Sequence, residues 1–180
     1  MLRYEKLTKE NLDLATEVQN KIFPDENGKK NFIDSIGEHI YRKELIFWIV
    51  FKEKNPIGII GLYAYHEYPE DGWMGWYGVL PEQTGKGYGS EVFDFFENYA
   101  KENRYKNIRL YTDELDNEIA TKLYYKKGMI SEVYKNKDDV FYEVSNTLIF
   151  SKSLTDQPVE KWNNKYLGLN EQEKRQKYKE

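Results

Sequence analysis

The sequence predicts an α/β fold in which helices flank a mixed, mostly antiparallel central sheet. The first observation is the order of the patterns: helices, a meander of strands, and then strand, helix, strand, helix and strand. The second is size, because 180 residues suit one domain that is large enough to bury a core. Third, 39% hydrophobic and 16% aromatic residues argue against a disordered chain.

The amino-terminal part predicts one strand and two helices. Residues 2–7 are expected to form a short strand, and Thr8 to Asn11 offer a weak helix N-cap. Leu12 to Ile22 keep apolar residues at helical spacing. Pro24 to Gly28 contain turn residues and predict a loop. A second, weakly patterned helix is expected over residues 29–42.

From Leu45 the pattern changes to that of buried strands. Leu45–Phe51 and Ile57–Tyr65 are dense in β-branched and aromatic residues, and the turn residues between them predict a hairpin. Tyr68–Gly72 reads as a loop. Trp73–Leu80 is expected to be the third strand of the meander, ending at Pro81.

The second half alternates helices and strands. A glycine-rich loop over residues 81–90 precedes a helix with Val92, Phe95, Phe96 and Tyr99 at helical spacing. The elements expected next are a strand, a helix stopped by Gly128, and two more strands: Asn107–Thr112, Asn117–Lys127, Val140–Val144 and Asn146–Leu154.

We expect residues 1–154 to form the domain and residues 155–180 to be a charged C-terminal extension. Residues 171–180 hold four Lys or Arg, three Glu and one aromatic residue, too little to bury much apolar surface. The first half of the extension is expected to pack onto the domain through a few apolar residues: Trp162, Tyr166, Leu167 and Leu169.

Composition excludes several kinds of site. The chain has no cysteine and two histidines, so thiolate chemistry is excluded and little remains to build a zinc site. Its net charge is 27 − 31 = −4, which gives no electrostatic footprint for nucleic acid. No apolar stretch has the length of a signal peptide core or a membrane span. We therefore expect a cytoplasmic protein without a metal.

Three glycines, Gly85, Gly87 and Gly89, lie between a strand and an amphipathic helix. A helix start carries unpaired N–H groups and a partial positive charge, and glycines leave no side chain between those donors and a ligand. The context predicts a phosphate site. The spacing fits neither a P-loop nor the dinucleotide fingerprint, and a plain flexible turn remains the alternative.

Two segments resemble the GNAT superfamily of N-acetyltransferases. Val79-Leu-Pro-Glu-Gln-Thr-Gly-Lys-Gly-Tyr-Gly-Ser90 is similar to the family's motif A. Asn117-Glu-Ile-Ala-Thr-Lys-Leu-Tyr-Tyr-Lys-Lys-Gly-Met129 resembles a second family segment in the expected order. The resemblance covers about residues 2–154, and it implies the GNAT-like acyl-CoA N-acyltransferase fold and acetyl-CoA as co-substrate.

The resemblance also implies roles for individual residues. Val79 would pair with the pantetheine arm, Asn117 would bond to it, and Tyr124 would protonate the coenzyme A thiolate. The pyrophosphate would lie against the loop residues Thr84, Gly85, Lys86, Gly87, Tyr88, Gly89 and Ser90. Thr84 departs from the family, which usually has Gln or Arg there, and Lys86 could compensate.

Helical spacing agrees with this assignment, since Asn117, Ala120 and Tyr124 share one helix face, whereas Tyr125 is assigned to packing. No general base is assigned. The candidates are Glu67, Glu70, Asp71 and His66, and Trp73 occupies the position where some family members have Glu. The aromatic residues of the central strands would suit a cationic amine.

The leading function is acetyl transfer from acetyl-CoA to a primary amine by direct attack in a ternary complex. The acceptor is expected to be a small molecule, although protein N-termini and lysines also remain open. A homodimer is not excluded, and neither a nucleic acid nor a membrane is expected as a partner. The alternative is a catalytically idle domain of this fold that binds acyl-CoA as a regulator.

Overall fold

The computed structural model describes residues 1–37, 42–115, 117–139 and 145–168. It divides into two compact units, Met1–Ile108 and Arg109–Glu180, and each is considered by itself. The first contains β1 (Arg3–Lys6), α1 (Leu12–Ile22), α2 (Gly28–Ile36), β2 (Glu44–Lys52), β3 (Asn55–Ala64), β4 (Asp71–Met74), β5 (Gly78–Val79), the short helix η1 (Pro81–Gln83) and α3 (Tyr88–Glu102).

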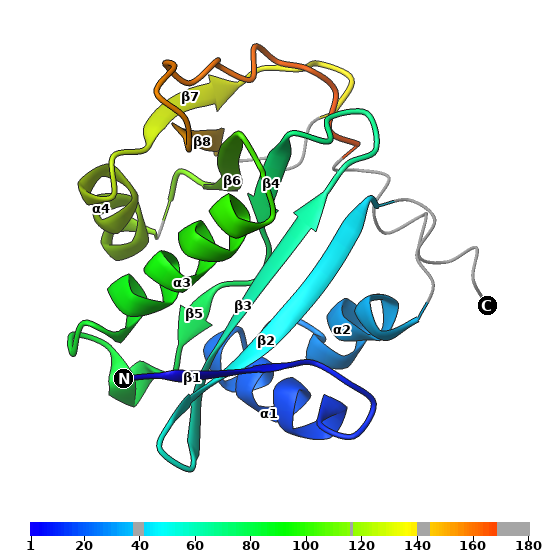
Figure 1. Ribbon diagram of the computed structural model, residues 1–180, viewed down its shortest axis with the longest axis vertical. Coiled ribbons are helices and arrows are strands. Elements are labelled where there is room, and N and C mark those ends of the chain that lie inside the picture. Colours follow the sequence, from blue (N-terminus) through cyan, green and yellow to red (C-terminus); the bar gives the residue numbers. More distant parts are fainter. Residues whose placement is uncertain (38–41, 116, 140–144, 169–180) are drawn as a thin grey trace. The chain divides into compact units, whose positions relative to one another are not determined.

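The first unit is built on the long antiparallel strands β2 and β3, which lie side by side in Figure 1. The strand order is β1-β2-β3-β4, and β5 also pairs with β3. All four of these pairings are antiparallel, as the predicted meander requires. The apolar content of β2 and β3 explains their position, because most of their residues are buried.

Helices cover both faces of these strands. Phe47 and Ile49 of β2 pack in one core cluster with residues of α1 and α2, such as Val18 and Phe32. Trp48 points to the opposite face, because side chains alternate along a strand. There its ring contacts Phe95 and Tyr99 of α3, with centroid separations of 5.2 and 4.7 Å.

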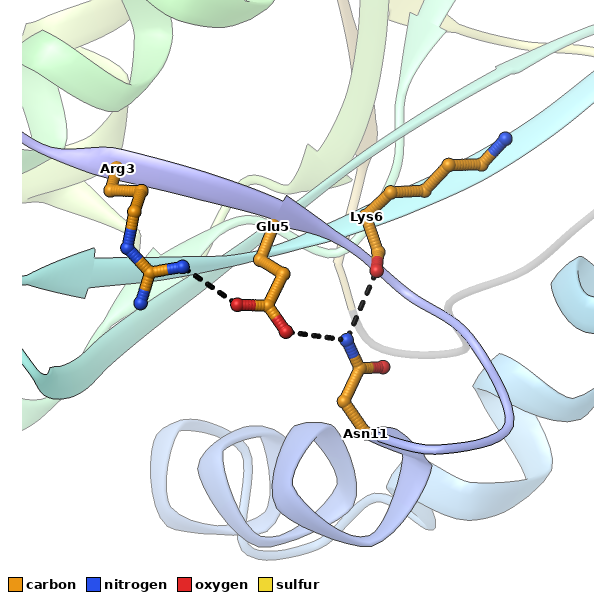
Figure 2. Close-up of polar contacts among 4 residues, drawn as sticks. All are labelled: Arg3, Glu5, Lys6 and Asn11. Carbon is orange, nitrogen blue, oxygen red and sulfur yellow. Dashed lines mark hydrogen bonds and ion pairs between the residues drawn. The ribbon is translucent and has the colours of Figure 1, made fainter.

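Polar contacts attach the start of α1 to β1 (Figure 2). The Arg3 guanidinium pairs with Glu5 at 2.7 Å, and Asn11 Nδ2 donates to Glu5 Oε1 at 3.2 Å and to the Lys6 carbonyl at 3.0 Å. Asn11 Oδ1 accepts from the Thr8 N–H at 2.8 Å. Asn11 is the N-cap residue of α1. Its side chain accepts no N–H group of the helix and instead stabilises the turn that precedes it.

The predicted strand Trp73–Leu80 is interrupted in the structure. Leu62 pairs with Met74, and Ile59 pairs with Gly78. Two residues of β3 therefore face three residues, 75–77, of the other strand. One extra residue is a β-bulge, which bends the strand and redirects the chain beyond it. Our expectation of one continuous strand was wrong because the side-chain pattern does not register a single inserted residue.

The second unit holds most of β6 (Asn107–Asp113), then α4 (Glu118–Lys126), β7 (Ile130–Tyr134) and β8 (Thr147–Ser153). The strand order is β6-β8-β7, and β7 and β8 are antiparallel. Strand β7 was not predicted, because its apolar residues Ile130, Val133 and Tyr134 do not alternate with polar ones, and the segment has only five residues. The strand predicted over Val140–Val144 lies outside the described residues.

The helix predicted over residues 29–42 begins at Gly28 and ends at Ile36. Gly37 leaves the helix with extended backbone angles, φ −96° and ψ −167°, which stops it earlier than expected. Residues 38–41 of this prediction lie outside the described residues.

The first half of the extension packs within the second unit. Of the four apolar residues expected to pack, two are buried. Trp162 and Leu167 are buried, whereas 42% of the Tyr166 surface is exposed. Leu169 lies outside the described residues. Glu132 of β7 accepts the backbone N–H groups of Trp162 and Asn163 at 2.7 and 2.8 Å.

Candidate coenzyme and acetyl-transfer site

The glycine loop leads from η1 into the 15-residue helix α3. Gly85 and Gly87 have φ angles of +75° and +83°. A side chain at either position would meet no atom within 4 Å. Glycine is therefore required here by the left-handed backbone, which other residues adopt at a cost, and not by lack of space. The loop from Thr84 to Gly87 is exposed.

This loop and the first turn of α3 present a row of unused donors. Among the described residues, no backbone N–H from Gly85 to Ser90 donates a hydrogen bond. The N–H groups of a first helical turn have no intrahelical acceptor, and the helix dipole adds positive charge at this end. The arrangement is suited to an anion such as a phosphate group.

The polar side chains of the loop are engaged locally. Thr84 Oγ1 donates to the Pro81 carbonyl at 2.7 Å, and Lys86 Nζ donates to Gln83 Oε1 at 3.1 Å. The Thr84 side chain therefore caps the C-terminus of η1. Lys86 is exposed and belongs to the segment that carries the unused N–H donors. Thr84 has a shorter side chain than the Gln or Arg that is usual in the family at this position.

One contact at this helix start was not predicted. The Tyr77 hydroxyl, at the end of the bulge, donates to the Gly89 carbonyl at 2.7 Å. It connects the segment between β4 and β5 to the first turn of α3. The aromatic sequence Trp73 to Tyr77 gave no signal for this contact, because it depends on the extra residue of the bulge.

Val79 exposes an open strand edge. The Leu80 N–H donates to the Ile57 carbonyl at 2.8 Å, so Leu80 and Ile57 form a hydrogen-bonded pair. In an antiparallel ladder the next pair, Val79 and Gly58, is of the non-hydrogen-bonded type. The N–H and C=O groups of Val79 therefore point away from β3, where an extended chain could pair with them.

Two of the predicted site residues belong to α4 of the second unit. Asn117 is its N-cap residue, and Asn117 Nδ2 donates to the Asp113 and Leu115 carbonyls at 3.2 and 2.9 Å. Tyr124 lies two turns later and is 6% exposed, with its ring 5.2 Å from that of Phe150. Burial raises the pKa of the Tyr124 phenol far above its ordinary value, so the side chain is protonated at neutral pH.

Tyr125 differs from its neighbour. Half of its surface is exposed, and its hydroxyl lies 2.7 Å from Ser131 Oγ. The two adjacent tyrosines therefore occupy distinct environments, one buried and one at the surface. Tyr125 was expected to be a packing residue and is one only in part, with its ring 5.2 Å from that of Phe150.

The candidate bases lie at the β3–β4 connection and at the start of β4. His66, Glu67 and Glu70 are exposed, and Glu70 pairs with Lys106 at 2.5 Å. Asp71, expected in a loop, is instead the first residue of β4 and is buried. Its Oδ1 accepts from Asn107 Nδ2 at 2.9 Å. None of these contacts singles out a base.

Two further properties bear on the kind of protein. No helix among the described residues is long and apolar enough to cross a membrane. Within the same part of the chain, no three His, Asp or Glu side chains gather in a group that could hold a metal ion.

Comparison with known proteins identifies the fold. The ribosomal-protein-S18-alanine N-acetyltransferase of Escherichia coli superposes with a TM-score of 0.69 at 13% identity, over 93% of this chain and 100% of that one. A GNAT family acetyltransferase of Elizabethkingia anophelis with acetyl-CoA bound gives 0.65 at 15% identity, over 85% and 98%. A Bacillus subtilis acetyltransferase in complex with CoA gives 0.65 at 14%, over 86% and 100%.

At these identities the structural likeness shows the fold, and it confirms the predicted GNAT-like sheet with flanking helices. No curated protein matches the sequence. The model of the Acetyltransferase (GNAT) family matches residues 11–129. Because this match covers more than half of the chain, the chain belongs to the GNAT family and is an acetyl-CoA-dependent N-acetyltransferase.

Proposed function

We propose that the chain transfers the acetyl group of acetyl-CoA to a primary amine of a small molecule, in the cytoplasm and by direct attack in a ternary complex. The observation that carries this proposal is the row of unused N–H donors from Gly85 to Ser90. It lies a few residues beyond the open edge at Val79, as a coenzyme with a pyrophosphate and an amide-bearing arm requires.

The coenzyme is proposed to bind mainly through backbone groups. The two amides of pantetheine would pair with the N–H and C=O groups of Val79 like an added strand. The pyrophosphate would accept hydrogen bonds from the N–H groups of Gly85 to Ser90. Asn117 Nδ2 already donates to two carbonyls. We therefore propose that Asn117 Oδ1 accepts a hydrogen bond from a pantetheine N–H.

The attacking nitrogen must be neutral. An alkylamine with a pKa of about 10.4 is only about 0.04% neutral at pH 7, so supplying this form is worth roughly 4–5 kcal/mol. The lone pair forms the C–N bond to the thioester carbon, and the C–S bond breaks. Starting from the neutral amine, the nitrogen loses one proton and the sulfur gains one. The ammonium form, which dominates at pH 7, must first release one further proton to the solvent.

Tyr124 is proposed to deliver the proton to the sulfur. A thiol has a pKa near 8.5 and a phenol near 10, so even an unperturbed phenol transfers its proton uphill, by roughly 2 kcal/mol. Burial raises the pKa of Tyr124 further. Tyr124 therefore acts best by donating a hydrogen bond as negative charge grows on sulfur, and completes the transfer as the nitrogen's proton becomes available.

Release of the coenzyme A thiol from acetyl-CoA, measured across a panel of amines, tests the function. The panel contains monoamines, diamines, amino acids and aminoglycosides, together with a peptide that has a free N-terminus. Amine-dependent thiol release, with an acetylated product seen by mass spectrometry, is expected. Tight acetyl-CoA binding without turnover on any amine would instead support the idle, regulatory alternative.

A further inference from the structure

Three aromatic rings meet where β3 pairs with β4. The centroids of Tyr63 and Trp73 are 6.2 Å apart with nearly parallel planes. Tyr65 stands edge-on to both, at 5.6 Å from Tyr63 and 5.9 Å from Trp73. All three side chains are buried. We refer to Tyr63, Tyr65 and Trp73 as the aromatic cluster.

The aromatic cluster lies on the face opposite to α3. Tyr63 is two residues beyond Gly61 and so points to the same side of β3. A side chain at Gly61 would overlap the Phe47 ring, and Phe47 belongs to the core formed with α1 and α2. Trp73 is the ladder partner of Tyr63 and shares that face, because paired residues project to the same side.

A cation of the chain itself covers this cluster. The Arg42 guanidinium carbon is 4.7 Å from the Tyr63 centroid and 4.4 Å from the Tyr65 centroid. A cation above the faces of two aromatic rings is an arrangement by which proteins recognise organic cations. Arg42 precedes β2 in the chain and is partly exposed, so it approaches the rings from outside the sheet.

We infer that the aromatic cluster binds a positively charged group of the acceptor, and that Arg42 occupies this place when the acceptor is absent. The inference rests on the proposed function. β4, which carries Trp73, leads through the bulge into β5, along which we placed the pantetheine. Trp73 of the cluster therefore lies on the strand that approaches the proposed reacting end of the coenzyme, and Tyr63 is its ladder partner on β3.

The chemistry restricts what this group can be. The nitrogen that attacks must be neutral, whereas aromatic faces attract the charged form. The group held over the rings is therefore a second charge and not the nucleophile. The acceptor class that satisfies both conditions is an amine with a separate cationic group, such as a diamine or a guanidino amine.

Cadaverine and pentylamine provide a matched pair of substrates, because they share one carbon chain and differ in the second ammonium group. With saturating acetyl-CoA we expect kcat/KM for cadaverine to exceed that for pentylamine by about tenfold. Tyr65→Leu should remove most of this preference. Tyr65→Phe keeps a ring face and should retain it, to within about a factor of two.

Arg42→Gln removes the internal competitor, so KM for cadaverine should fall by about threefold or more, while KM for pentylamine stays unchanged. Arg3→Gln is the matched control, because Arg3 also lies over a ring, Phe51, at 4.1 Å but far from the aromatic cluster in the chain. It should change neither KM. Circular dichroism confirms that all four variants are folded.

Equal kcat/KM for the two amines in the wild type, or a preference that survives Tyr65→Leu, would overturn the inference and leave the proposed function intact. A rise in KM for cadaverine in Arg42→Gln would also overturn it. If no amine is acetylated, calorimetry of cadaverine with the acetyl-CoA-bound protein still decides: binding that Tyr65→Leu abolishes supports the cluster as a cation site, and no binding refutes it.

Discussion

At the residue scale, the proposed chemistry depends on a few side chains and on the backbone conformation of two glycines. Tyr124 is buried and protonated, whereas Tyr125 lies at the surface with its hydroxyl beside Ser131. The proposed phosphate site has the opposite character, because it would consist of backbone N–H groups that the sequence controls only through Gly85 and Gly87.

Tyr124→Phe removes the proposed proton donor but keeps the ring and its packing against Phe150. General-acid help contributes typically about 10²–10⁴-fold, so we expect kcat to fall at least about tenfold on a productive acceptor. Acetyl-CoA affinity, measured by calorimetry, should stay the same. Tyr125→Phe is the control and should retain its turnover. A Tyr124→Phe enzyme with wild-type turnover would exclude the acid role.

Gly87→Val tests the coenzyme loop. The added side chain has space around it, but valine resists a φ of +83°, so the loop must rearrange and displace its N–H donors. Acetyl-CoA binding should weaken by about 2 kcal/mol. Gly37→Val is the matched control, since a side chain there also meets nothing within 4 Å at an ordinary φ of −96°. Unchanged affinity in a folded Gly87→Val protein would contradict the site.

Thr84→Arg tests whether the departure from the family weakens binding. The Thr84 hydroxyl donates to the Pro81 carbonyl and supplies no charge. A guanidinium at this position would add a charge-assisted bond to the pyrophosphate and strengthen acetyl-CoA binding by roughly 1–2 kcal/mol. Thr84→Val controls for the loss of the hydroxyl. An unchanged or weaker affinity in Thr84→Arg would mean that the backbone and Lys86 already satisfy the phosphates.

At the scale of the elements, the apolar pattern predicted where strands and helices lie. It did not predict features that depend on the hydrogen-bond register between strands. β2 and β3 have strong patterns, and their predicted ends differ from the observed ones by one or two residues. The helix α3 was predicted, but it begins at Tyr88, within the segment expected to be a loop. The bulge at residues 75–77 was missed because it changes register without changing composition. The roles proposed for Asn117 and Tyr124 come from motif resemblance alone. The contact of Arg42 with Tyr63 could not be predicted, because nothing local indicates a contact across 21 residues of chain.

The C-terminal extension provides a prediction at this scale. The Arg109 guanidinium donates to the Glu160 carbonyl at 2.9 Å and lies 5.3 Å from the Trp162 ring, which is fully buried. Removing residues 155–180 deletes both contacts and should lower the free energy of unfolding by at least about 3 kcal/mol, as does loss of a buried Trp.

Truncation after Asn170 is the comparison, because it removes almost only charged and polar residues. It should leave both turnover and the urea midpoint unchanged. Equal stability of the two truncated proteins would show that residues 155–168 do not support the second unit. A large fall in turnover after the shorter truncation would show a role for the last ten residues.

At the scale of the whole molecule, the chain has 16 tyrosines, and several are held away from water. Burial is the main cause that raises the pKa of Tyr4, Tyr99, Tyr105, Tyr124 and Tyr134. Tyr99 and Tyr105 also donate to the two oxygens of Glu44, and that negative charge disfavours a phenolate beside it. These tyrosines make the free energy of unfolding depend on pH in the alkaline range.

The sign comes from proton counting. Above pH 10 the unfolded chain releases phenolic protons that the folded protein retains, so the unfolded state binds fewer protons and the free energy of unfolding falls as pH rises. Below pH 10 both states are protonated and this contribution is fully present.

Urea unfolding should therefore give nearly constant stability from about pH 8 to 9.5 and a steep decline above about pH 10. Tyr124→Phe, with one phenol fewer, should decline less steeply. Phenolate absorbance that develops fully while circular dichroism still reports a folded protein would contradict the prediction, because it would place these hydroxyls in contact with solvent.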